Sequence, residues 1–280
     1  MSRRAFPEVD EAILVVGVGL IGGSIALGLR NAGFTQLWGA DLAAGLDAVD
    51  EPQLFSRLLV ADAQSLSAAS RQVSLVILAT PLPVIESQLG WFVDAPCVTD
   101  CGSAKRTICE RAAALGLSSF CGGHPMAGKE RGGFEHASAE LFRGRSWFIC
   151  PTEITDPSSI ALAQQLATLL GAQPLVVDAA DHDRGVALTS HANQLVASAM
   201  VKLAGRERRR FAGPGFADST RVGGGPEAMW SGILERNADE VAAALGELEQ
   251  ELRRVRESLA QGDPAPALGL LAEARRLKRW

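Results

Sequence analysis

The chain has 280 residues, of which 47% are hydrophobic and 21% charged, and this is the composition of a soluble globular protein long enough for two domains. Its formal net charge of −5 disfavours a surface that follows nucleic-acid phosphates, so nucleic acid is not an expected partner. The five scattered cysteines form no CxxC pair and no even disulfide framework, which indicates a reducing compartment.

The first predicted element is a buried strand over 13–16, which leads into a glycine-rich turn and then an apolar helix. Gly17, Gly19 and Gly22 have the GxGxxG spacing, and the next predicted strand ends at Asp41. A strand, a glycine turn, a helix and an acidic strand end together are the context in which this motif binds a dinucleotide. A glycine-rich turn without a ligand is the alternative, and the complete context disfavours it.

Each glycine has a separate predicted role. Gly17 permits the tight turn, Gly19 lets the backbone approach a pyrophosphate, and Gly22 lets the helix pack closely on the strand. The phosphates would then lie at the positive end of the helix. A carboxylate at Asp41 would accept hydrogen bonds from the adenosine ribose hydroxyls and repel a 2′-phosphate, which favours NAD over NADP.

Further apolar runs follow in chain order. The run over 73–79 predicts a strand covered on both faces, and short strands are expected over 97–100, 119–121, 147–150 and 174–177, with helices over 105–114 and 158–170 between them. This alternation predicts an α/β fold with a doubly wound, mostly parallel Rossmann-type sheet, whose strand ends meet at one edge. The predicted cofactor-binding residues are Gly17, Gly19, Leu20, Ile21, Gly22, Asp41, Thr80, Pro81 and Gly102.

The pattern changes to helices over 181–204 and 226–260, with no convincing strand. We therefore expect a dinucleotide-binding domain over 1–178 and a helical substrate and dimerisation domain over 179–280. The arginine-rich segment 205–210 is typical of a solvated loop or helix end. One face of the second predicted helix is apolar, which indicates helix packing or a dimer seam. Its residues are Val241, Leu245, Leu248, Leu252 and Val255.

Neither a membrane span nor a metal site is expected. The long apolar run near the N-terminus carries its glycines at fingerprint positions, so it is interpreted as a strand and a helix, and a cytoplasmic protein without a membrane partner is predicted. The four histidines form no HxH, HExxH or His-Cys arrangement. His182 fits the capped start of a helix better than a ligand set.

His124 differs from the other histidines because it follows two glycines at a predicted strand end and precedes Pro125. From its position alone, a general acid/base role and a buried structural role are both open. Cys101 lies in the neighbouring strand-end loop, and a reactive thiol there is a weaker alternative because no histidine is adjacent in sequence.

Six motifs follow one another along the chain: GVGLIGGS at 17–24, LATP at 78–81, TDCGSAK at 99–105, GHPMAGKERGG at 123–133, DHDRGVALTSH at 181–191 and GFADSTRVGGGPEAMW at 215–230. In this order, over roughly residues 12 to 260, they resemble the prephenate/arogenate dehydrogenase family of tyrosine biosynthesis. The HPMAG segment after TDxGS, and DSTR followed by a tryptophan, are more specific than any dinucleotide fingerprint.

The resemblance implies NAD-dependent oxidative decarboxylation of arogenate, of prephenate or of both, by a homodimer. Hydride leaves C4 of the cyclohexadienol ring, CO2 leaves C1, and the product is tyrosine or 4-hydroxyphenylpyruvate. His124 would take the 4-hydroxyl proton, and Ser103 would hydrogen-bond the hydroxyl and the cofactor side. Arg221 would bind a substrate carboxylate through its planar fork.

The other implied substrate-site residues follow from the same resemblance. Glu130 and Asp218 correspond to acidic partners of the arginine, and Trp230 corresponds to a wall residue that a second subunit can supply. Ser190 and His191 correspond to contacts with a substrate carboxylate. Structural alternatives stay open: a domain-interface ion pair for Arg221, a helix N-cap for Ser103 and simple core packing for Trp230.

The sequence departs from the family pattern at two places. Gln194 stands where many members have a second histidine, so recognition there is expected to use neutral hydrogen bonds, and our hypothesis is that arogenate is at least accepted. Ser231 and Gly232 follow Trp230 where the family usually has Arg-Asp, so a local ion pair is missing.

Two rival functions remain. One is a related dehydrogenase that acts on a 4-amino-4-deoxy analogue or on a different β-hydroxy acid. The other is a non-catalytic NAD-sensing regulator, and the joint presence of His124, Ser103 and Arg221 speaks against it because a sensor needs only the nucleotide loop.

Overall fold

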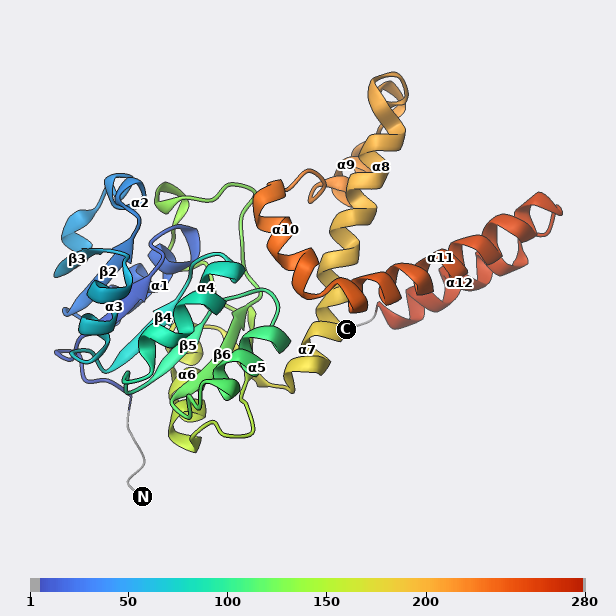
Figure 1. The fold of residues 1–280 in the computed structure, drawn as a ribbon. Helices are drawn as coiled ribbons and strands as arrows, with labels where there is room; N and C mark the ends of the chain where they lie inside the picture. Colours follow the sequence, from blue (N-terminus) through green and yellow to red (C-terminus); the bar gives the residue numbers. More distant parts are fainter. Residues whose placement is uncertain (1–5, 279–280) are drawn as a thin grey trace. The chain divides into compact units, whose positions relative to one another are not determined.

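The computed structural model describes residues 6–278, in which strands and helices alternate up to residue 176 and only helices follow (Figure 1). The strands are β1 (Ile13–Val16), β2 (Leu37–Asp41), β3 (Arg57–Val60), β4 (Leu75–Leu78), β5 (Val98–Asp100), β6 (Phe120–Pro125), β7 (Ser146–Cys150) and β8 (Gln173–Val176). The α-helices are α1 (Leu20–Asn31), α2 (Ala43–Asp47), α3 (Ala63–Ser70), α4 (Leu82–Gln88), α5 (Arg106–Ala114), α6 (Pro157–Leu169), α7 (Ala179–Val186), α8 (Asn193–Arg208), α9 (Pro214–Thr220), α10 (Glu227–Arg236), α11 (Ala238–Ala260) and α12 (Ala265–Leu277).

The strands form one eight-stranded sheet in the order β3-β2-β1-β4-β5-β6-β7-β8. Strands β1 to β6 run parallel to one another, β7 pairs antiparallel with β6, and β8 pairs parallel with β7. The predicted doubly wound, mostly parallel sheet is confirmed. Because β1 to β6 run the same way, the loops after them lie along one edge of the sheet, which is where such folds bind ligands.

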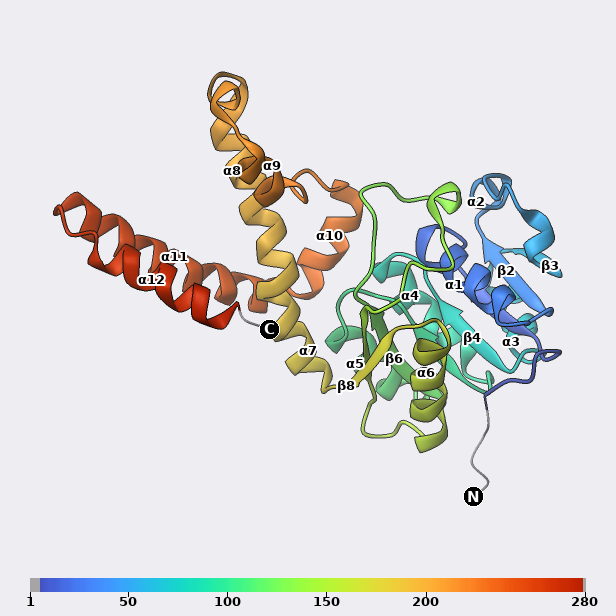
Figure 2. The same cartoon turned by 180° about the vertical axis from the view of Figure 1, so that it is seen from behind.

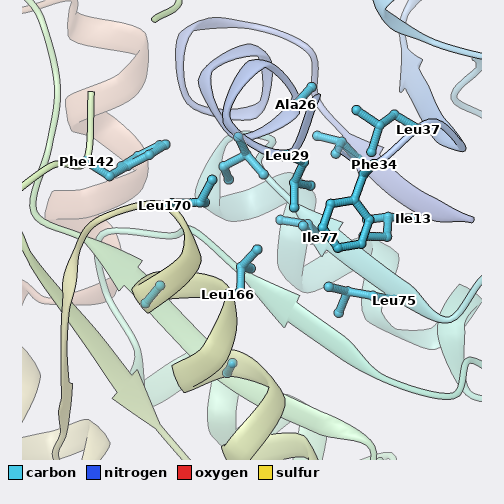
Figure 3. Packing of buried hydrophobic residues seen from close by; sticks show 14 of the residues in the cluster. Ile13, Ala26, Leu29, Phe34, Leu37, Leu75, Ile77, Phe142, Leu166 and Leu170 are labelled. Atoms are coloured by element: carbon cyan, nitrogen blue, oxygen red, sulfur yellow. The ribbon is translucent and has the colours of Figure 1, made fainter. Parts of the chain in front are cut away.

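The central strands of the sheet are buried on both faces, as their apolar sequences require. Ile13 and Val15 of β1 belong to one core cluster, and Leu14 and Val16 belong to the other. Helices α1 and α6 contribute to the first cluster, part of which Figure 3 shows, and α3, α4 and α5 contribute to the second. Helix α6 lies behind the sheet in Figure 1 and in front of it in Figure 2. Each fully buried aliphatic side chain contributes about 1.5–3 kcal/mol to the free energy of folding.

Strand β3 and helix α3 lie within the segment 42–72, in which the sequence predicts no element. Arg57 and Val60 of β3 are exposed, and Leu58 and Leu59 are half-buried, so this edge strand has no continuous apolar run. The guanidinium of Arg57 lies 4.7 Å from the ring centroid of Trp38, on the neighbouring strand β2. An edge strand that uses a long cationic side chain to pack on its neighbour leaves little trace in a hydrophobic pattern.

The chain divides into two compact units. The nucleotide unit runs up to Gly185 and includes 224–236, whereas the helical unit consists of 186–223 and the residues from Asn237 onward. Helix α10 thus groups with the nucleotide unit, although the sequence suggests one domain over 179–280. The reason is that α10 packs closely on α4. A Cβ on Gly232 of α10 would lie 2.9 Å from Cδ of Pro83 of α4, and Arg236 Nη2 lies 2.7 Å from Oε2 of Glu86.

Two of the long predicted helices are interrupted. The helix expected over 226–260 is two helices, α10 and α11, because Asn237 between them has non-helical dihedrals (φ −125°, ψ 28°). The helix expected over 181–204 contains a π-helical turn, Ala187–Ala192, of the kind often found at functional sites. Helix α12 was not predicted. Within residues 6–278, no helix is long and apolar enough to cross a bilayer.

Candidate active site

The glycine turn after β1 has the geometry that its motif requires. Gly17 has φ +91°, and a Cβ there would lie 2.7 Å from the carbonyl oxygen of Ala79. A Cβ on Gly22 would lie 1.9 Å from the carbonyl oxygen of Gly17, so α1 packs directly on the turn. A Cβ on Gly19 would meet no atom of the described chain within 4 Å, so this face of the turn is open to a ligand.

Asp41 brings a carboxylate to the same turn from the end of β2. Its Oδ2 accepts a hydrogen bond from the backbone N–H of Val18 at 2.8 Å, and its Oδ1 accepts one from Leu42 N at 2.7 Å. The half-buried Thr80 follows β4, and Pro81 is the N-cap of α4. The turn, the carboxylate and these strand ends share one sheet edge, and an open pyrophosphate cradle beside an acidic acceptor fits a dinucleotide.

Two buried charges join the ends of β5 and β6. The Lys105 ammonium forms a short ion pair with Oδ2 of Asp100 and donates to the Gly123 carbonyl oxygen at 2.8 Å. Asp100 also accepts hydrogen bonds from Gly102 N at 2.8 Å and from Gly123 N at 3.0 Å. Both ionic side chains have 0% exposure. The cluster holds the Ser103 loop against the strand that carries His124.

The electrostatics of the cluster keep Lys105 charged. Burial alone would lower the pKa of its ammonium, but the neighbouring Asp100 carboxylate outweighs burial, and the pKa is raised above its ordinary value. Removing either charge would leave the other buried and uncompensated, which is strongly destabilising. The TDCGSAK motif is therefore partly structural, and the sequence reasoning did not identify Asp100 or Lys105.

His124 lies in β6 opposite Phe148 of β7 and is 8% exposed. Its Nδ1 lies 2.8 Å from Nε2 of His182, which is 2% exposed. His182 Nδ1 in turn lies 2.7 Å from Oδ1 of Asp183. Sequence reasoning interpreted His182 only as part of a helix start and missed this contact. A signal for the burial of His182, though not for its partner, was available, because His182 and the buried Val186 are four positions apart and share a face of α7.

Asp183 also caps the helix that follows Ser103. Its Oδ1 accepts from Lys105 N at 2.7 Å and its Oδ2 from Arg106 N at 2.9 Å, at the positive N-terminus of α5. The N-cap position of α5 is Lys105, so the alternative that Ser103 is the N-cap is wrong. Ser103 is half-buried in the same loop.

The surroundings shift the titration of the buried groups. Burial lowers the pKa of His182 below 6.5, against the opposing effect of the Asp183 hydrogen bond. Burial would raise the pKa of Asp183, but the hydrogen bonds from His182 and from the amides of Arg106 and Lys105 outweigh it, and the pKa falls below 3.8. Burial raises the pKa of the Cys101 thiol, so the thiol stays protonated, which disfavours a nucleophilic role.

The helical unit carries most of the predicted substrate contacts. Ser190 is half-buried and His191 is buried, both in the π-helical turn, and His191 Nδ1 lies 3.2 Å from Nδ2 of Asn237. Gln194 is buried near the start of α8. The exposed Arg221 follows α9, and close packing of Gly223 on the backbone of Ala197 holds this segment beside α8.

The predicted site residues thus fall into two groups. Within the nucleotide unit, the glycine turn, Ser103 and His124 lie at one sheet edge, and the unit also contains the exposed Glu130 and the half-buried Trp230. Within the helical unit, Ser190, His191 and Gln194 lie on consecutive turns, and Asp218 is exposed on α9. Among the residues that the structure describes, no three His, Cys, Asp or Glu side chains gather as a metal site would need.

Known proteins of similar sequence and fold share both units. Residues 25–176 match the family described as the prephenate dehydrogenase nucleotide-binding domain, and residues 178–272 match the prephenate dehydrogenase dimerization domain. A prephenate dehydrogenase from Bacillus subtilis (strain 168) is 29% identical over an alignment of 272 residues, and the match covers 91% of this chain and 72% of that protein.

Two solved structures extend the likeness over the whole chain. The prephenate dehydrogenase from A. aeolicus, in complex with hydroxyphenyl propionate and NAD+, has a TM-score of 0.88 and 25% identity, covering 98% of this chain and 99% of that one. The Synechocystis arogenate dehydrogenase has a TM-score of 0.77 and 31% identity, with coverages of 96% and 98%. The chain therefore belongs to the prephenate dehydrogenase family of oxidoreductases.

Proposed function

We propose that the protein is an NAD-dependent dehydrogenase that oxidatively decarboxylates arogenate, prephenate or both. The observation that carries the proposal is the placement of His124 at the carboxyl end of β6, on the sheet edge that also holds the glycine turn. A titratable imidazole beside a dinucleotide site is what proton removal coupled to hydride loss requires. The family membership and the relatives that act on these two compounds support it.

NAD is the cofactor, and the residues fit it. Gly19 leaves room for a pyrophosphate at the N-terminus of α1, and Asp41 offers carboxylate oxygens to the ribose of the adenosine half. A carboxylate there also repels the 2′-phosphate of NADP. When bound, NAD accepts the hydride that leaves C4 of the substrate ring.

His124 acts as the general base. Its Nδ1 is bonded to His182, so Nε2 is the ring nitrogen that takes the proton of the 4-hydroxyl as the hydride departs. Ser103, in the loop after β5, hydrogen-bonds the same hydroxyl and helps to hold it in place. Loss of CO2 from C1 then makes the ring aromatic, which drives the reaction.

Residues of the helical unit bind the substrate carboxylates. The guanidinium of Arg221 offers a planar fork that matches one carboxylate, a geometry that lysine does not reproduce. Glu130 and Asp218 orient this arginine, and Trp230 forms a wall of the site. The remaining contacts come from Ser190, His191 and Gln194.

Gln194 determines how the substrate side chain is recognised. This amide carries no charge, is buried, and both donates and accepts hydrogen bonds. An amide therefore suits the amino-acid side chain of arogenate as well as the pyruvyl group of prephenate, and we propose that arogenate is at least accepted. A preference for prephenate of about a thousandfold in kcat/KM, which is about 4 kcal/mol, would reject this hypothesis.

The protein acts as a homodimer in this proposal. Residues 178–272 match a dimerization-domain family, and helices α11 and α12 expose large apolar side chains. Leu268 and Leu271 of α12 are 60% and 62% exposed, and Leu252 of α11 is 54% exposed. A second copy of the chain would cover such surfaces.

The test is NADH formation from purified protein, with arogenate and prephenate each offered together with NAD or NADP. We expect turnover with NAD and a loss of about 10²–10⁴-fold in kcat for His124→Asn, with NAD affinity nearly unchanged. A wild-type protein that binds NAD but oxidises neither compound would support the sensor alternative. Turnover only of a 4-amino-4-deoxy analogue would support the related dehydrogenase.

A further inference from the structure

The three buried side chains His124, His182 and Asp183 form one hydrogen-bonded chain. His124 Nδ1 and His182 Nε2 are 2.8 Å apart, and His182 Nδ1 and Asp183 Oδ1 are 2.7 Å apart. The exposed fractions of the three residues are 8%, 2% and 0%. This series of hydrogen bonds runs from the proposed base to a buried carboxylate. The same order of groups occurs in active sites where a further group orients a catalytic histidine.

The positions of the protons in this chain follow from its acceptor end. Asp183 accepts from the amides of Lys105 and Arg106 at the start of α5, so it is an ionised acceptor and has no proton to donate. His182 must therefore carry its proton on Nδ1. A neutral His182 then has its lone pair on Nε2, which makes His124 Nδ1 the donor and leaves the lone pair of His124 on Nε2.

The charges that face His182 have both signs: the carboxylates of Asp183 and Asp100 favour a protonated ring, whereas Lys105 opposes it. Asp183 on α7 bonds its Nδ1, whereas Lys105 before α5 and Asp100 on β5 form their own ion pair. Phe148 on β7 packs edge-on against the ring, with centroids 5.1 Å apart, and brings no charge. Burial lowers the pKa of His182, so the ring stays neutral near pH 7.

We infer that His182, held by Asp183, is a positioning residue that fixes His124 in the Nδ1–H tautomer, so that Nε2 is the nitrogen that takes the substrate proton. The inference rests on the proposed function, since it assigns a role in that reaction. Once Nε2 is protonated, the positive charge on His124 is stabilised by its hydrogen bond to His182 and, beyond it, by the carboxylate. His182 touches neither substrate nor cofactor in this scheme.

The first test needs no substrate. Two-bond ¹H–¹⁵N correlation spectra of the ¹⁵N-labelled protein near pH 7.5 report which nitrogen of each ring is protonated. We expect His124 and His182 both to carry the proton on Nδ1, and His124 to lose this fixed state in the His182→Leu variant. A His124 ring protonated on Nε2 in the wild-type protein would overturn the inference, whatever the enzyme's activity.

The second test compares two substitutions of His182. Leucine removes the hydrogen-bond acceptor, and we expect kcat to fall about 10²-fold, with the acidic limb of the kcat/KM profile moved to lower pH and little change in KM for NAD. Glutamine can accept from His124 and donate to Asp183, so we expect His182→Gln to recover most of the activity. Equal kcat values and unchanged pH profiles in wild type and His182→Leu would contradict a positioning role.

A packing control separates hydrogen bonding from shape. Phe148→Leu changes a ring that packs on both histidines without hydrogen bonds to either, and we expect kcat to change less than about 10-fold. An equal loss in Phe148→Leu and His182→Leu would overturn the inference in favour of simple packing. If His182→Leu does not fold, the wild-type spectra and the glutamine variant decide the question. A wild-type protein without turnover would reject the proposed function. The tautomer measurement would still test whether His182 fixes the proton of His124 on Nδ1.

Discussion

The two units of the chain bury their apolar residues to very different degrees. In the nucleotide unit, strand residues such as Leu14, Val15 and Ile77 have 0% exposure. In the helical unit, Leu252 and Leu268 are more than half exposed, at 54% and 60%. The first unit completes its own core, whereas the second presents apolar faces that its own residues do not cover. Stability of the second unit is therefore expected to depend on association.

The largest expected effect comes from a buried charge in the nucleotide unit. Lys105→Met would leave the Asp100 carboxylate buried without its cation, and we expect a loss of about 3–5 kcal/mol in the free energy of unfolding. The matched control is Arg71→Met, which removes an ion pair to Asp94 whose side chains are 54% and 57% exposed, and it should change stability little. Urea unfolding monitored by circular dichroism measures both. Equal losses would show that the Asp100 site is open to water.

Two truncations of apolar side chains, one in each unit, test this difference in burial between the units. Ile77→Ala, in the centre of the sheet, should cost about 2–4 kcal/mol in the free energy of unfolding at any protein concentration. Leu252→Ala should have little effect on the folded chain but should shift the monomer–dimer equilibrium toward monomer, as measured by sedimentation velocity over a dilution series. If Leu252→Ala leaves association unchanged, this side chain lies outside the dimer contact.

The smallest expected effect is a pH dependence of stability from His182. Because burial places its pKa in the folded protein below the unfolded value of 6.5, the unfolded chain binds the proton first as the pH falls. Stability is therefore present above pH 6.5 and is lost as the pH falls through the lowered pKa. The contribution of Asp183 is lost only below about pH 3.8, so the two windows are separate. Unfolding free energies between pH 7.5 and 4.5 should fall less steeply in His182→Gln than in wild type.

The strands were predictable where burial leaves a continuous apolar run. Residues Ile13–Val16 and Leu75–Leu78 are buried on both faces, and their sequences contain only aliphatic residues. Strand β3 was not predictable in this way because it lies at the sheet edge and none of its four residues is fully buried. The break at Asn237 also escaped prediction, since the helical apolar pattern continues across it while the backbone does not.

The site was predictable only where a motif carries its own chemistry. The three glycines of the turn and His124 follow from local spacing and strand position. His182, Asp183 and Lys105 did not, because their roles depend on contacts between segments distant in the sequence, such as the 58 positions that separate His124 from His182. A pattern read along the chain gives no sign of which polar residue will be buried against which other.

The placement of α10 has a further consequence for how this architecture can be divided. The polypeptide passes between the two units after Gly185, after Gly223 and after Arg236. No single cut can therefore release a complete nucleotide unit, because a fragment that stops at residue 185 lacks Arg236, the partner of Glu86. Chimaeras between relatives need two coordinated exchanges to keep each unit intact, and a single crossover after Gly185 or after Gly223 would pair α10 with a foreign α4.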